Sequence, residues 1–109
     1  MRVLLIGGVT VFLDDEREYL ETRWPDGLTC PAIPQPGRTT WQDTIDHELG
    51  HTWLAVTLDG LPWSPTLRKV AEQRAGRWDG RAPTDAEVAE EEARVLAWQK
   101  VLGNASRPW

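Results

Sequence analysis

The chain has 109 residues, which fits one domain of ordinary size and argues against two. Hydrophobic residues make up 40% of it and charged residues 27%, a balance that excludes a disordered chain. The net charge of -5 argues against a nucleic-acid-binding surface, and no apolar run is long enough to cross a membrane, so we expect neither as a partner.

The N-terminal residues are expected to form a β-hairpin. Gly7-Gly8 separates two β-prone runs, Val3–Ile6 and Val9–Leu13, and two glycines between such runs are typical of a tight turn. The same stretch faintly resembles a secretory signal. However, the glycines interrupt it and acidic residues follow it at once, so we interpret it as strands.

A second pair of strands is expected at residues 19–24 and 28–32. Pro25-Asp26-Gly27 lies between them and favours a turn, because proline presets its backbone angle and glycine accepts a positive φ. Residues 31–38 contain three prolines and one glycine, which predicts an extended connection.

The rest of the chain carries the signals of three helices. Their expected spans run from a cap at Thr39 or Thr40 to about Leu58, from Thr66 to Ala75, and from Thr84 to about Leu102. Ser64-Pro65 is typical of the start of the second helix, and Thr84 with Glu87 has the spacing of a capping box. Gly103-Asn104 predicts the end of the last helix.

The only two histidines lie in His47-Glu48-Leu49-Gly50-His51, which has the pattern H-E-x-x-H. Four residues of helix advance ~6 Å, so both imidazoles leave the same face and can each bind one Zn²⁺ at ~2.1 Å. Glu48 lies to the side of that face, where it is placed to take a proton from a water molecule that the metal activates. The alternatives are two ordinary surface histidines, or a bound metal without catalysis.

Two residues near the histidines, Gly50 and Asp43, are unusual or potentially functional at their positions in the helix. Gly50 costs the helix ~1 kcal/mol relative to alanine, and close packing of the helix against a strand is one reason to tolerate it. Asp43 precedes His47 by one turn and could orient its imidazole, but we favour a role at the helix start, where the dipole stabilises a carboxylate.

Catalytic zinc usually takes three protein ligands, and without a third histidine the last must be an oxygen. Glu91 and Glu92 flank an apolar stripe of the last helix, and periodicity does not choose between them. The alternative is that residues 90–92 form a solvated charge run. The apolar stripe consists of Val88, Val95, Leu96, Trp98 and Leu102.

Three segments, His47–His51, Leu61–Leu67 and Glu92–Ala97, resemble a minimal zincin metallopeptidase of the gluzincin type. More narrowly, the chain is similar to small phage-encoded H-E-x-x-H proteins and to ImmA/IrrE-like peptidases. The resemblance implies zinc, a strand-lined cleft and peptide-bond hydrolysis. It also favours Glu92 over Glu91 as a ligand, because in those peptidases an alanine often follows the ligand glutamate.

The chain departs from larger zincins because it has no later histidine or tyrosine to stabilise an oxyanion. Tyr19, its only tyrosine, falls among the predicted strands. Arg68, Arg74 and Arg77 are other possible donors, and the sequence favours none of them.

We therefore predict one α+β, zincin-like domain over residues 1–109. A small, mostly antiparallel sheet with its extended connection (residues 1–38) should pack on a helical part (39–103) that carries the metal site. The predicted function is a zinc-dependent metallohydrolase, most simply a peptidase, with ligands His47, His51 and Glu92 (alternatively Glu91) and with Glu48 as general base. A strand edge beside the cleft could align a peptide or protein substrate.

Two other functions remain open. The first is a catalytically silent metal-binding phage accessory or interaction protein, and the second is a metal-free interaction domain that uses some of the seven tryptophans. We favour core packing for the tryptophans, and a small buried side chain for Cys30. The single cysteine fits a reducing compartment, so we expect the cytoplasm of a host cell, with a virion as the other possibility.

Overall fold

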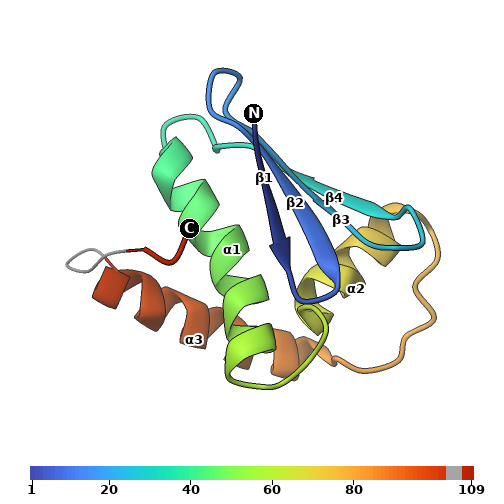
Figure 1. Cartoon of the computed structure of the whole chain (residues 1–109). Helices are drawn as coiled ribbons and strands as arrows, with labels where there is room; N and C mark the ends of the chain where they lie inside the picture. Colours follow the sequence, from blue (N-terminus) through green and yellow to red (C-terminus); the bar gives the residue numbers. More distant parts are fainter. Residues whose placement is uncertain (103–106) are drawn as a thin grey trace.

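The computed structural model describes residues 1–102 and 107–109. It has an α+β fold, with an antiparallel sheet followed by helices that pack against it and against each other (Figure 1). The elements are β1 (Arg2–Ile6), β2 (Val9–Asp14), β3 (Tyr19–Arg23), β4 (Thr29–Ala32), α1 (Trp41–Thr57), α2 (Pro65–Arg74) and α3 (Asp85–Leu102). In the described part of the chain, no helix combines the length and apolar character that a bilayer span requires.

The predicted hairpin is confirmed and its turn is held by the connection between α1 and α2. Ile6 pairs with Val9 across Gly7-Gly8, and Gly7 adopts a φ of +57°, which favours glycine. The N–H of Gly8 donates to the carbonyl oxygen of Pro62 at 2.7 Å. This contact fixes the segment that leads into α2.

The sheet has the order β1-β2-β3-β4, with every neighbouring pair antiparallel, so that β1 and β4 are the edge strands. Side chains of β2 alternate between buried and half-buried, as expected for a sheet covered on one face. The core lies between that face and the helices. It includes Val11, Leu13, Leu20, Trp24 and Cys30 from the sheet region, Ile45 and Leu49 from α1, and Leu67 and Ala71 from α2.

The predicted helix starts are confirmed by their capping contacts. Thr40 caps α1 and forms a capping box with Asp43, while the Ser64 hydroxyl accepts the N–H of Leu67 at the start of α2. Thr84 and Glu87 exchange the equivalent contacts before α3. The predicted stop of α3 at Gly103-Asn104 lies outside the described residues.

Helix α3 packs against α1, and this contact corrects two expectations. A Cβ added to Gly50 would lie 3.1 Å from the ring of Trp98 and 3.2 Å from Val95, so the close packing is against α3 and not against a strand. Leu96 is 53% exposed and does not belong to the buried stripe, whereas Val95 and Leu102 are buried. The face of α3 that meets α1 therefore mixes apolar with polar side chains.

The aromatic side chains and the cysteine mostly serve the core, as favoured from the sequence. Trp24 is 2% exposed and Cys30 is 3% exposed. The other tryptophans are half-buried, and four of them pack against the core: Trp41, Trp53, Trp63 and Trp109.

Candidate metal centre

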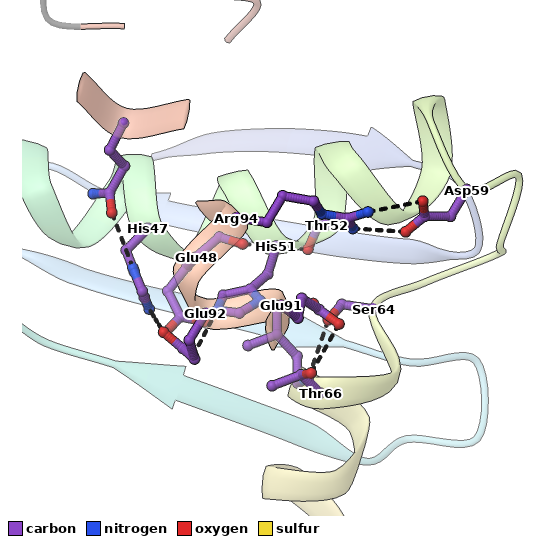
Figure 2. A network of polar contacts seen from close by, with 12 residues as sticks. His47, Glu48, His51, Thr52, Asp59, Ser64, Thr66, Glu91, Glu92 and Arg94 are labelled. Atoms are coloured by element: carbon purple, nitrogen blue, oxygen red, sulfur yellow. Dashed lines mark hydrogen bonds and ion pairs between the residues drawn. The ribbon is translucent and has the colours of Figure 1, made fainter. Parts of the chain in front are cut away.

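The two histidines lie one turn apart on α1, on the side that faces α3 (Figure 2). Their rings meet edge to face, with centroids 4.9 Å apart. The side chain of His51 is 1% exposed, but that of His47 is 30% exposed. The pair is thus buried at one end and open to solvent at the other.

Glu92 of α3 joins both histidines. Its Oε2 atom lies 3.0 Å from Nε2 of His47, and its Oε1 atom lies 2.8 Å from Nε2 of His51. One nitrogen from each histidine and one carboxylate oxygen lie within 4.8 Å of one another. The structure therefore brings together the three side chains that the sequence analysis selected as ligands.

This donor set fits a divalent transition metal. Two imidazole nitrogens and a carboxylate oxygen match the set that binds zinc in many catalytic sites. All three donors come from helices rather than loops, so their relative positions are set by the packing of α1 on α3. The side chain of Glu92 is 38% exposed, so the site is accessible from the same side as His47.

Glu91, the alternative ligand, meets the opposite nitrogen of His51. Its Oε1 atom lies 2.7 Å from Nδ1 of His51 and accepts the hydroxyl of Ser64 at 2.8 Å. Its Oε2 atom accepts the hydroxyl of Thr66 at 2.8 Å. Both Glu91 and Glu92 therefore face α1, and the interpretation of this segment as a solvated charge run holds only for the exposed Glu90.

His47 is also held at its second nitrogen, by a residue that the sequence analysis missed. Oε1 of Gln99, two turns after Glu92 on α3, lies 3.1 Å from Nδ1 of His47. Asp43 does not take this role. Its carboxylate accepts the N–H of Thr40 at 3.0 Å, which confirms the favoured function at the helix start.

The carboxylates determine the charge of the site. Burial of the His51 ring opposes protonation, but hydrogen bonds to Glu91 and Glu92 outweigh it and raise the pKa of His51 to about 9. The contact with Glu92 also raises the pKa of His47. The same contacts hold the pKa of the Glu92 carboxyl well below its usual range. Without a metal, the proton on His51 therefore offsets part of the negative charge of these carboxylates.

Glu48 has a different environment. Burial raises the pKa of its carboxyl, and its Oε2 atom is buried without a hydrogen-bond partner among the described residues. Glu48 lines a pocket of about 410 Å³ together with both histidines, Cys30 and Arg74. A carboxylate oxygen that is buried without a hydrogen bond among the described residues favours the protonated form of Glu48, which makes this group a candidate to hold a proton beside the pocket.

A larger groove of about 650 Å³ is also lined by His47 and Glu48. Its walls include Ile33, which follows β4, and Leu96 of α3, which are 64% and 53% exposed. Large apolar side chains that line an opening next to polar groups are typical of a ligand-binding groove.

The edge strand β4 contributes Pro31 to the pocket around the two histidines. Pro31, in β4, has no N–H, and its carbonyl oxygen accepts Nη1 of Arg74 at 3.0 Å. Strand pairing with a substrate, as expected from the sequence, is therefore restricted at this position. Among the donors considered for an oxyanion, Arg74 lines the pocket around the two histidines. Arg68 and Tyr19 do not line it, and they bind Asp26 and Glu21 respectively.

Comparisons with known proteins add no assignment. No protein family model matches the chain, and no curated protein or solved structure matches it either.

Proposed function

We propose that this protein is a zinc-dependent hydrolase and, more specifically, a peptidase of zincin type. One observation supports the proposal above the others. His47, His51 and Glu92 offer three converging donors with one side open to solvent, and the adjacent Glu48 has a carboxylate oxygen with no hydrogen-bond partner in the described part of the chain. A purely structural zinc site usually closes its coordination with a fourth protein ligand.

Zinc bound there would act as a Lewis acid that polarises a carbonyl group and lowers the pKa of water. Residues of the chain would transfer the proton and stabilise the negative charge that develops on the substrate. Glu48, whose pKa is raised by burial, would take a proton from that water and deliver it to the leaving amine. Arg74 is the cation that lines the pocket, and we assign it the developing negative charge on the substrate oxygen.

The substrate we propose is an extended peptide lying in the groove past His47 and Glu48. Ile33 and Leu96 present apolar surface on its walls, which favours an apolar side chain beside the bond to be cleaved. Because Pro31 restricts pairing with β4, these side chains would contribute more to substrate binding than main-chain hydrogen bonds do.

The test compares hydrolysis of a peptide library by the zinc-loaded wild type, E48Q and E90Q. Glu90 is exposed on the same helix as Glu92, so E90Q is the matched control for loss of a carboxylate. We expect equal hydrolysis by the wild type and E90Q, hydrolysis about 10²- to 10⁴-fold slower by E48Q, and the same zinc content in all three proteins. Equal rates of hydrolysis by the wild type and E48Q would contradict the proposal.

Zinc binding without hydrolysis of any peptide would instead support the second candidate, a catalytically silent metal-binding protein. The observation that favours this candidate is the position of Tyr19, which binds Glu21 and does not line the pocket. For either function we propose the cytoplasm as the compartment, because the buried Cys30 is a free thiol and fits reducing conditions.

A further inference from the structure

Both oxygens of the Glu91 carboxylate contact residues of α1 and of the start of α2. His51 lies against one of its oxygens, and the hydroxyls of Ser64 and Thr66 donate to it at 2.8 Å each. Ser64, Thr66 and His51 are all 2% exposed or less and the side chain of Glu91 is 15% exposed, so these contacts are largely buried. Burial opposes ionisation of Glu91, but the three hydrogen bonds lower its pKa below the usual value.

We propose that Glu91 is a positioning residue for His51 and not a metal ligand, and that Ser64 and Thr66 hold it in place. The proposal rests on the proposed function as far as the metal is concerned. A carboxylate at Nδ1 fixes the proton on that nitrogen, so that only Nε2 is free to face the ion. Glu92, which contacts Nε2 of both histidines, is the ligand.

The arrangement also connects the site to the start of α2. The Ser64 side chain accepts the N–H of Leu67 as the helix cap and donates to Glu91. Thr66 lies in the first turn of the same helix. Docking of α2 on the core therefore completes the support of His51, and metal affinity should depend on residues that never touch the ion.

The experiment titrates Co²⁺ and Zn²⁺ into wild type, E91Q, E92Q and T66V, with E90Q as the control. We expect E91Q to weaken zinc binding about 10- to 100-fold while leaving the Co²⁺ absorption bands unchanged, because the ligand set is the same. T66V should weaken binding less than E91Q, and E92Q should change the bands. The proposal would be overturned if E91Q altered the Co²⁺ absorption bands as E92Q does. It would also be overturned if E91Q bound zinc as tightly as E90Q.

A metal-independent measurement separates this proposal from the proposed function. In ¹⁵N-labelled, metal-free protein, the Nδ1 proton of His51 should give a downfield signal that exchanges slowly with water. E91Q and T66V should shift this signal and E90Q should not. If the wild type binds no zinc, the proposed function fails, but this signal still decides the role of Glu91. A signal that is absent, or unchanged in E91Q, would overturn that role.

Discussion

Without metal, the protein should lose stability as the pH rises through the neutral range, because its buried histidine is held in the charged form. The pKa of His51 is about 9 in the folded chain and 6.5 in a free side chain. A folded-state pKa above the unfolded value gives stability that is fully present below pH 6.5 and is lost as the pH rises to about 9.

The magnitude follows from the same two values. At pH values between these two pKa values the folded chain binds one more proton than the unfolded chain, so the free energy of unfolding falls by about 1.4 kcal/mol per pH unit. Over the interval from 6.5 to about 9 the loss is about 3 kcal/mol. This would be a large fraction of the stability of a small domain. The raised pKa of His47 acts in the same direction.

The assay is urea denaturation of chelator-treated protein at intervals between pH 6 and 9.5. E92Q removes one carboxylate from the histidines and should give a shallower decline, while E90Q should follow the wild type. Zinc affinity should change in the opposite sense and rise with pH, because the metal displaces the same proton. The reasoning would be refuted if the free energy of unfolding of the wild type stayed constant or rose from pH 6.5 to 9. It would also be refuted if E90Q made the decline as shallow as E92Q does.

Three further predictions concern single side chains. E48Q should lower the rate of peptide hydrolysis by about 10²- to 10⁴-fold without changing the zinc content, measured by turnover and metal analysis; an unchanged rate would exclude Glu48 as the base. Gly50→Val should lower the free energy of unfolding by about 1–3 kcal/mol, because even a Cβ added at this position would lie 3.1 Å from Trp98. Urea denaturation checks this, and an unchanged midpoint would show that α3 moves aside freely. Thr40→Ala should cost about 1 kcal/mol in the same assay, since it removes the cap of α1; a neutral effect would mean that Asp43 alone suffices as the cap.

Much of the fold could be predicted from the sequence because its boundaries carry local signals. The hairpin at Gly7-Gly8 and the helix starts at Thr40, Ser64 and Thr84 depend on residues close to each boundary. Such signals do not describe how elements pack together. The sequence therefore marks Gly50 as unusual for a helix but does not identify its partner, Trp98 of α3.

The candidate site could be predicted in part, for a related reason. H-E-x-x-H fixes the spacing of His47 and His51 within one helix, whereas the glutamate must come from a distant segment. Helical periodicity brings both Glu91 and Glu92 towards α1. Which nitrogen of His51 each one meets depends on how α3 crosses α1 and on where α2 begins, and neither is encoded locally.

Supporting side chains were hardest to predict because they resemble ordinary surface or capping residues. The sequence correctly predicts Ser64 as a helix cap, but its second contact, with Glu91, has no local signal. Gln99 is an uncharged polar residue near the end of α3. Only its spacing of two turns from Glu92 could have suggested that it reaches His47.

The central claim is that His47, His51 and Glu92 bind one zinc ion, and X-ray absorption at the zinc edge tests it most directly. For protein loaded with about one equivalent, we predict a shell of nitrogen and oxygen at ~2.0–2.1 Å with scattering from two imidazole rings, reduced to one ring in H47A. Cys30 lines the same pocket, so a sulfur scatterer at ~2.3 Å would mean a different ligand set. A spectrum without imidazole scattering, or protein that retains no zinc, would contradict the account.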